Sequence, residues 1–382
     1  MRAIPSGGSI GWNDSIGADD SNDADDANDA TIGRGARSAS RVFRVVACAG
    51  VRAMAPAVLA AVCCAGWSSP GTAAESRLKG VEVQLDNDQF AAGADGERWY
   101  THGTLVRMHF EPRVDGLHAR FARAWCGATT TCDAQTRSTY LLGFGQLLYT
   151  PAFAPRTEPQ PWDWPYSAWL YVSSSLLLQG PDTQQTLGVT VGVTGPAALG
   201  EQVQNIVHRI LQQAPTGGWD YQLRPRLGVQ LDYSNLRRHG LGVANVDLVR
   251  RLAATVGNIQ AGAGAGALLR WGQLPDAPTF PGEAAPDAGA DLGAWYVFAG
   301  ADARWVARNQ LIDGQPYGYT SLVTHEPFVW DVFAGVSLRL SAAWRLDFTV
   351  VQRSREFDTP FEPVTWPPFR YGSVVLRWAP AR

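Results

Sequence analysis

A short stretch with helical spacing carries the residues best suited to acid–base chemistry. Residues 200–223, GEQVQNIVHRILQQAPTGGWDYQL, interrupt a chain that otherwise alternates as β-strands do. Gln204 and His208 stand four residues apart, so a helix would place both side chains on one face. We expect Gly217 and Gly218 to end that helix. A histidine can act as a general base or a metal ligand because imidazole titrates near neutral pH. A lone histidine is more often a surface or core residue, so this hypothesis needs a second polar cluster.

That second cluster lies far upstream, where one alternating segment ends and the next begins. Asp86, Asn87 and Asp88 end the first segment, and Thr101 and His102 lie at the start of the second. Carboxylate, amide and hydroxyl oxygens are ligands that suit calcium, a hard cation. Taken alone, an Asn-Asp pair at a strand end is more often turn chemistry than a binding site.

The elements that must position these groups are strands. From Val81 onward, apolar residues alternate with polar residues or glycine, which is the period of strands with one apolar face. The polar faces carry charges, and the apolar faces often start or end in aromatic residues such as Trp169, Trp295 and Trp344. Such aromatic girdles predict an all-β fold, a transmembrane antiparallel β-barrel of about twelve strands with a short helix in an outer loop. A secreted β-sandwich is the alternative. The expected strands are 80–90, 98–111, 137–150, 167–179, 185–195, 224–235, 245–257, 259–273, 294–308, 328–340, 343–355 and 369–379.

The strand count also predicts which connections share one side of the membrane. If the barrel begins in the periplasm, alternate connections lie outside. These outer loops are expected at 91–97, 151–166, 196–223 and 309–327. The helix with His208 and the strand end with Asp88 should therefore meet at the same outer rim.

The sequence leaves three features of the barrel undecided: a disulfide, the side of one connection and the role of the inward arginines. The connection with Cys126 and Cys132 should lie in the periplasm, where export permits a disulfide between them. The stretch 275–293 falls on either side, depending on how two weak strands are counted. Inward-facing arginines could bind lipid phosphates, although ion pairs across the lumen are the simpler expectation; they are Arg304, Arg339, Arg345 and Arg353.

The N-terminal region differs in composition from the rest. Residues 1–40 hold an acidic run with small residues that cannot bury a core, which predicts a disordered tail from a start placed too far upstream. Residues 41–74 combine a basic flank, an apolar run and a small-residue end, the order of a secretory signal peptide cleaved after Ala74. The barrel would then occupy 75–382. With a formal net charge of -3, the chain lacks a basic nucleic-acid footprint, so no nucleic-acid partner is expected.

Several dispersed motifs, in this order and spacing, resemble the outer-membrane lipid A 3′-O-deacylases. The resemblance covers essentially the whole chain after the signal peptide, and its strength lies in the number of motifs. The motifs are LDNDQF, RWYTHG, QLLYTP, PWDWPYSAWLY, GVTGP, EQVQNIVHRI and GGWDYQL.

The resemblance implies a twelve-stranded outer-membrane barrel, expected to be a monomer, that removes the 3′-linked acyloxyacyl group of lipid A with the help of Ca²⁺. Carried over by position, His208 would be the general base that activates water. Asp88 would hold calcium with Asn87, and the ion would polarise the ester carbonyl. Asn87, Thr101 and Gln204 would orient water or complete the polar shell.

One departure bears on the metal. Some deacylases carry a glutamate just after the helix histidine, and the corresponding residue here is Ala214. One carboxylate is therefore missing, which puts calcium affinity in question. Two other functions remain open: an outer-membrane phospholipase with the same metal chemistry, and a non-catalytic barrel in which His208 is only a loop residue.

Overall fold

The computed structural model describes residues 77–91, 98–112, 116–129, 132–285, 295–360 and 369–380. The expected acidic tail at 1–40 and signal peptide at 41–74 lie outside these ranges. Within them, no helix is both long enough and apolar enough to cross a membrane.

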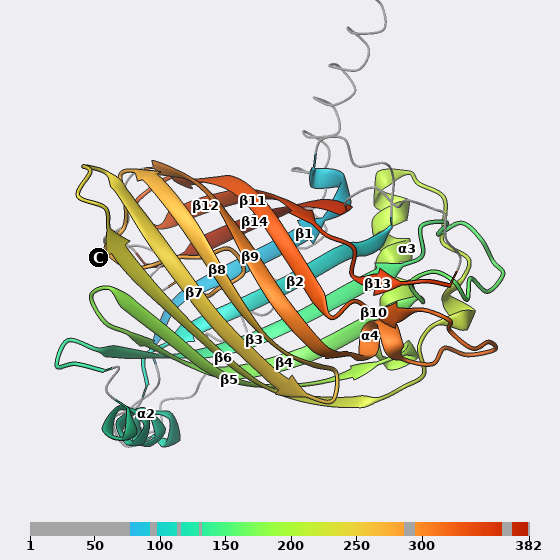
Figure 1. The fold of residues 1–382 in the computed structure, drawn as a ribbon, viewed down its shortest axis with the longest axis horizontal. Helices are drawn as coiled ribbons and strands as arrows, with labels where there is room; N and C mark the ends of the chain where they lie inside the picture. Colours follow the sequence, from blue (N-terminus) through green and yellow to red (C-terminus); the bar gives the residue numbers. More distant parts are fainter. Residues whose placement is uncertain are drawn as a thin grey trace, which may run out of the picture. The chain divides into compact units, whose positions relative to one another are not determined.

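Twelve antiparallel strands form a closed barrel, because β1 pairs with β14 as well as with β2 (Figure 1). Every expected strand is present within a few residues of its predicted bounds, and the predicted fold class is confirmed. The strands are β1 (Leu78–Asn87), β2 (Trp99–Phe110), β3 (Arg137–Thr150), β4 (Ser167–Gln179), β5 (Thr183–Thr194), β6 (Leu227–Gly240), β7 (Val246–Gly257), β8 (Gln260–Gly272), β9 (Trp295–Asn309), β11 (Phe328–Arg339), β12 (Trp344–Arg353) and β14 (Phe369–Trp378). A separate two-stranded sheet pairs β10 (Thr324–His325) with β13 (Phe357–Asp358).

The strands turn their apolar faces outward, which distinguishes this barrel from a sandwich. On β12, Arg345 and Asp347 are buried inside, whereas Trp344 is 41% exposed. On β11, Asp331 is buried and Trp330 is 45% exposed. A soluble sandwich would bury the apolar faces and expose the charges. The pattern is that of a barrel with lipid around it.

Ion pairs between neighbouring strands neutralise the buried charges of the lumen. Asp331 accepts from Arg304 at 2.9 Å and from Arg353 at 2.8 Å. Arg345 donates to Ser337 Oγ at 2.7 Å, and Arg339 donates to the carbonyl of Ser341. Two of the inward arginines thus form the predicted ion pairs across strands.

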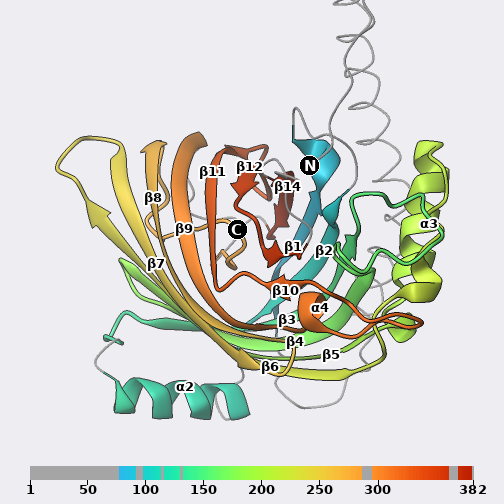
Figure 2. The same ribbon diagram turned by 45° about the vertical axis from the view of Figure 1, so that its right-hand side comes forward.

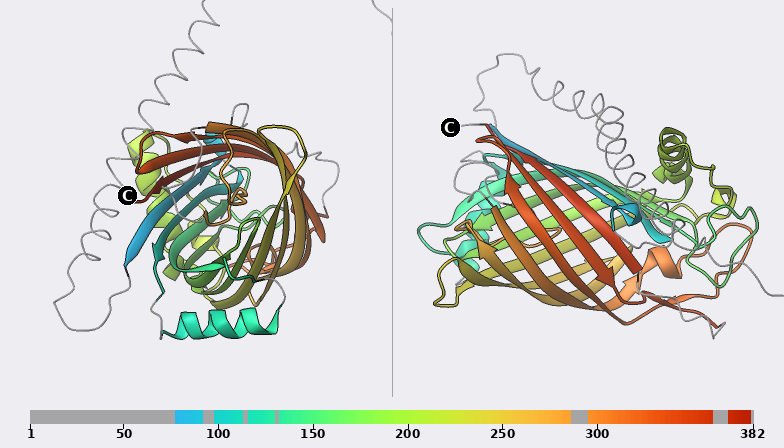
Figure 3. Two further views of the ribbon diagram at one scale, coloured as in Figure 1. Left: turned by 90° about the vertical axis from the view of Figure 1, so that its left-hand side faces the viewer. Right: turned by 90° about the horizontal axis from the view of Figure 1, so that it is seen from above.

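A segment of the chain also fills part of the lumen. After β8, residues 273–285 turn back inside the ring of strands (Figure 3). Phe280 packs edge-on against Phe333 with ring centroids 5.4 Å apart. Glu283 accepts from Arg251 at 2.7 Å and from Ser234 at 2.8 Å. The segment enters the lumen from the end of the barrel opposite His208. The connection after β8, whose side the sequence left open, therefore begins at that end.

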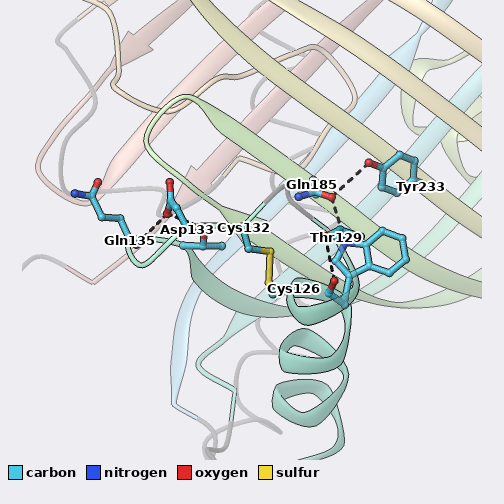
Figure 4. Close-up of a disulfide and its surroundings, with 9 residues drawn as sticks. Cys126, Thr129, Cys132, Asp133, Gln135, Gln185 and Tyr233 are labelled. Carbon is cyan, nitrogen blue, oxygen red and sulfur yellow. Dashed lines mark hydrogen bonds between the residues drawn. A yellow bond between two sulfur atoms is a disulfide. The ribbon is translucent and has the colours of Figure 1, made fainter.

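The two ends of the barrel carry different helices (Figure 1). At one end, α2 (Leu117–Ala128) joins β2 to β3, and the expected disulfide links Cys126 to Cys132 (Figure 4). At the other end lie the remaining helical elements, which are η1 (Asp88–Phe90), η2 (Pro196–Ala198), α3 (Gly200–Leu211), η3 (Trp219–Tyr221) and α4 (Gln310–Asp313). We call these the α2 end and the α3 end.

Two helical features depart from the sequence-based expectation. Helix α3 ends at Leu211 rather than at Gly217, because Gln212 adopts a left-handed conformation with φ 58° and its N–H bonds to Arg209 and His208 carbonyls. Pro215 follows closely and cannot continue a helix. Helix α2 was not predicted at all.

Candidate active site at the outer wall

Helix α3 lies on the outer surface of the barrel wall (Figure 2). Leu147 and Tyr149 line the lumen, so Leu148 between them faces outward. Leu148 packs in one buried cluster with Ala168 of β4 and with Trp219. The helix therefore covers the outside of β3 and β4, on the face that meets lipid elsewhere on the barrel.

A glycine lets the helix approach the wall closely. A Cβ atom built on Gly200 would lie 2.8 Å from the Cβ of Ala168 and 2.4 Å from the ring of Trp219. Just before the helix, the carbonyl of Ala198 accepts a 2.6 Å hydrogen bond from Gln146 on β3. The first turn of α3 is thus fixed to β3 and β4. Gln204 and His208, one and two turns later, are positioned with it.

The amide of Gln204 is buried and oriented by the loop that follows the helix. Its Oε1 accepts from Trp219 Nε1 at 2.8 Å and from Thr216 Oγ1 at 3.1 Å. An indole N–H can only donate, so the oxygen of the amide must be the atom facing Trp219. The NH₂ group consequently points the other way.

His208, only 5% exposed, is held in a defined tautomer. Its Nδ1 lies 2.6 Å from the carbonyl oxygen of Ala214. A carbonyl can only accept, so Nδ1 carries a proton, and in the neutral imidazole Nε2 is the basic nitrogen. This is the tautomer that a general base needs. Position 214 therefore orients the imidazole of His208 through its backbone carbonyl.

The upstream cluster forms a compact turn at the end of β1. Asn87 Oδ1 accepts from Gln89 N at 2.8 Å and caps η1, while Asn87 Nδ2 donates to the Thr101 carbonyl at 2.9 Å. Asp88 is 1% exposed, and its Oδ2 accepts from Arg98 N at 3.3 Å. The turn interpretation of this pair is therefore confirmed, and the same cap positions the buried carboxylate of Asp88.

Thr101 connects the upstream cluster to the wall beneath α3. The pairing of β2 with β3 skips Thr101 between Tyr100 and His102, which is a β-bulge. Its Oγ1 shares a 2.8 Å hydrogen bond with Thr150 Oγ1 at the end of β3. The structure thus joins Asn87 to Thr101 by a hydrogen bond. The upstream cluster and the cluster around His208 both lie at the α3 end. Strand β3 stands between β2, which carries Thr101, and β4, on which α3 packs.

The loop between β3 and β4 closes the barrel at this end. Asp163 accepts from Trp99 Nε1 at 3.0 Å, from Trp164 N at 2.7 Å and from Ala152 N at 2.9 Å. Burial raises the pKa of the Asp163 carboxyl, against the effect of these hydrogen bonds. The carboxyl group fixes the loop over the aromatic residues at the mouth of the lumen.

Below this cap the lumen holds a polar cavity of about 410 Å³. Tyr100 donates to Asp86 at 2.7 Å on its wall, and Arg251, Arg304 and Arg353 line it together with acidic partners. Positive and negative side chains neutralise one another there, so the cavity shows no preference for a lipid phosphate. The cavity and the His208 site lie on opposite faces of the strands.

The donors near Asp88 can be compared with what calcium requires. Asp88, the Thr101 hydroxyl and nearby carbonyls supply only oxygen, the right type for a hard cation. Among the described residues, no group of three His, Cys, Asp or Glu side chains could hold a metal ion. Low ligand charge weakens calcium binding. The residues therefore fit calcium in type and suit a weak site.

Sequence reasoning missed the residues that hold the site together. Thr150, Thr216 and Trp219 each make a hydrogen bond to a candidate residue. Trp219 lies inside the quoted GGWDYQL motif and Thr150 inside QLLYTP. Their place inside these motifs was therefore a sign that Trp219 and Thr150 matter to the site. Their side chains do not titrate near neutral pH, so the sequence suggested no chemical role for them.

Comparisons with known proteins agree with this fold. Residues 56–379 match the family described as outer membrane protein LpxR. The structure is similar to LpxR from Salmonella typhimurium, with 20% sequence identity and a TM-score of 0.62, covering 78% of this chain and 99% of that one. The translocator domain of autotransporter NalP from Neisseria meningitidis is a more distant match, with 12% identity, a TM-score of 0.36 and coverage of 89% and 99%. No curated protein sequence gives a significant match.

Proposed function

The chain belongs to the family of the outer membrane protein LpxR, and we propose that it hydrolyses the 3′-acyloxyacyl ester of lipid A in the outer leaflet. The observation that carries the proposal is the tautomer of His208. Nδ1 is bound to the Ala214 carbonyl at 2.6 Å, which leaves Nε2 as a base. This base lies on a helix packed against the outside of the barrel wall.

The position of the site supports a membrane lipid as substrate. The ester that joins the acyl group to the sugar can reach the outside of the wall as lipid A moves within the bilayer, whereas lipid A cannot enter a lumen lined by ion pairs. The connections at the α3 end include 151–166, 195–226 and 310–327, while the α2 end has the short turns 180–182 and 241–245. Barrels of this type have their longer loops outside the cell, so we place the α3 end at the outer leaflet.

The chemistry assigned to His208 is general-base hydrolysis. Nε2 takes a proton from a water molecule while the water oxygen attacks the ester carbonyl carbon. The bond to the sugar oxygen then breaks, and the imidazolium returns the proton to that oxygen. We assign Gln204, with its NH₂ directed away from Trp219, and Thr101 to the orientation of water and substrate.

Calcium is the cofactor that we propose for this site. Asp88 would hold it, with Asn87 Oδ1 and neutral oxygens nearby, and it would supply positive charge to polarise the ester carbonyl. With one carboxylate, half-saturation should require about 10⁻⁴–10⁻³ M calcium, the range of weak sites. We propose that the enzyme acts as a monomer.

Mass spectrometry of lipid A tests the proposal. The protein is expressed in the outer membrane of a host with known lipid A, and membranes are incubated with calcium or with chelator. Loss of one acyloxyacyl unit, placed at the 3′ position by fragmentation, is expected only with calcium. Lysophospholipid in place of deacylated lipid A would identify a phospholipase, and neither product from a folded barrel would indicate a non-catalytic protein.

A substitution tests the calcium assignment separately. Ala214→Glu restores the carboxylate found in some relatives, and the backbone carbonyl that orients His208 remains. Added ligand charge should lower the calcium concentration needed for half-maximal activity about tenfold. An unchanged calcium dependence would place the ion away from residue 214.

A further inference from the structure

Helix α2 packs against the outside of the barrel at the end opposite the active site. Ala122 lies in a buried cluster with Leu176 and Leu178 of β4, and Leu187 of β5 packs against it. Leu176 and Leu178 share the outward face of β4 with Val172, which is 51% exposed. The surface under α2 is thus continuous with the lipid-facing wall.

The face of α2 that points away from the barrel is apolar with a basic flank. Leu117 is 77% exposed and Phe121 is 49% exposed, and their four-residue spacing places them on one face. Arg120 and Arg123 are exposed beside them, and the helix LHARFARAWCGA contains no acidic residue. Helices with this composition lie in the interface of a membrane.

Contacts on its inner side hold α2 in this orientation. Trp125 Nε1 donates to Gln185 at 3.2 Å, and the ring of His118 lies 3.9 Å from that of Tyr140. The disulfide then fixes the last turn of the helix to Cys132 (Figure 4). The outward face of α2 is therefore held in a fixed direction, and the helix itself lies outside the ring of strands (Figure 2).

We propose that α2 is a binding surface for anionic phospholipids of the periplasmic leaflet. Leu117 and Phe121 contact the acyl chains, and Arg120 and Arg123 bind lipid phosphates. Charge complementarity and continuity with the lipid-facing wall identify this occupant. The surface is independent of the His208 site, and it places α2 in the leaflet opposite to that of the proposed substrate.

Lipid retention measured by native mass spectrometry tests the charged contacts. The full chain is purified in nanodiscs of phosphatidylethanolamine with phosphatidylglycerol. The double variant Arg120→Gln with Arg123→Gln should retain phosphatidylglycerol less well, by about fivefold for each arginine removed. The matched control, Arg156→Gln with Arg209→Gln, removes the same charge at the α3 end and should change retention little. If both double variants lose phosphatidylglycerol equally, retention depends only on the net charge of the protein, and the proposal is overturned.

Photo-crosslinking tests the apolar contact in intact cells. Phe121 is replaced by benzoylphenylalanine, and Phe153, 50% exposed at the α3 end, receives the same change as a control. Phospholipid adducts at position 121 and lipid A or no adducts at position 153 are expected. A protein adduct at position 121, or no adduct there while the protein is folded, would overturn the proposal.

Discussion

Helices α2 and α3 are a natural pair for comparison because they have the same length and both lie outside the wall, at opposite ends of the barrel, but bury opposite chemistry. Each has 12 residues, lies on the outside of the wall over β4 and carries one histidine. Helix α2 buries Ala119 and Ala122, whereas α3 buries Gln204 and His208. Helix α2 docks with small apolar residues buried against the wall, together with a hydrogen bond and the disulfide. The buried polar groups of α3 are not needed for docking of this kind, and the proposed catalytic role gives a reason for them.

The two histidines show the difference at the level of single atoms. His208 is fixed by a hydrogen bond from Nδ1 to a backbone carbonyl, which selects one tautomer. His118 packs on Tyr140, its Nε2 lies 3.5 Å from the Ser174 hydroxyl, and partial burial lowers the pKa of its imidazole. A hydroxyl can donate or accept, so neither contact selects which nitrogen carries the proton. A defined tautomer is thus the feature that separates His208, the proposed base, from His118.

Replacing each histidine in turn should give the largest contrast. His208→Ala removes the general base and should lower deacylation by roughly two to four orders of magnitude. His118→Ala should leave the rate within about twofold, since packing at α2 touches no reacting atom. Lipid A mass spectra over time measure both. Similar losses in the two variants would make the effect one of folding and remove the distinction between the helices.

Glycine substitutions test whether close approach to the wall matters for one helix only. Gly200→Ala places a methyl group against Trp219 and Ala168, and overpacking costs about 1–3 kcal/mol, so α3 should shift and activity should fall about tenfold. A Cβ on Gly127 of α2 meets nothing within 4 Å. Gly127→Ala should therefore stabilise α2 by up to about 1 kcal/mol without a change in activity. An active Gly200→Ala enzyme would mean that α3 need not touch β4.

Each helix region also contains a tryptophan that donates to a glutamine, which gives a third matched pair. Trp219→Phe leaves the buried Gln204 oxygen without its 2.8 Å donor and should cost about 1–3 kcal/mol locally, with a fall in kcat of up to about tenfold. Trp125→Phe removes the 3.2 Å bond to Gln185 and should leave kcat unchanged. Steady-state rates on purified lipid A distinguish them. A larger effect for Trp125→Phe would reverse the assignment of the two regions.

The smallest effect on activity is expected from the disulfide. Replacing Cys126 and Cys132 together by serine removes a short closed loop, which should cost about 2 kcal/mol of local stability. Hydrogen exchange should become faster in α2, while deacylation continues at its original rate. Slower deacylation would reveal coupling between the two ends of the barrel.

Strands could be predicted from the sequence far better than the helices that decorate them. The period of two in β11 and β12 identifies these segments as strands and shows which side chains face the lumen. A shift of the strand by one residue would turn every charged side chain toward the lipid. Helix α2 was missed because all of it lies in the connection between β2 and β3, where the period of two says nothing about structure. The spacing of Leu117, Phe121 and Trp125 was a signal for it.

The candidate site was predictable only as far as its chemistry is visible in side-chain types. His208, Gln204 and Asp88 stand out as polar groups at helix or strand ends. The partner of His208 could not be predicted, because it is a backbone carbonyl and every residue type provides one. The end of α3 was misplaced for a related reason, since the left-handed conformation of Gln212 depends on the fold of the following loop.

The bond between His208 and the Ala214 carbonyl also bears on how such an enzyme can change over generations. A contact made by the main chain survives any substitution at residue 214 that leaves the loop in place. Under the proposed function, mutational drift there adds or removes a carboxylate, and so alters the demand for metal, without first disabling the proposed base. Metal dependence and proton transfer would then be separable traits, and selection could adjust one of them while the other stays constant.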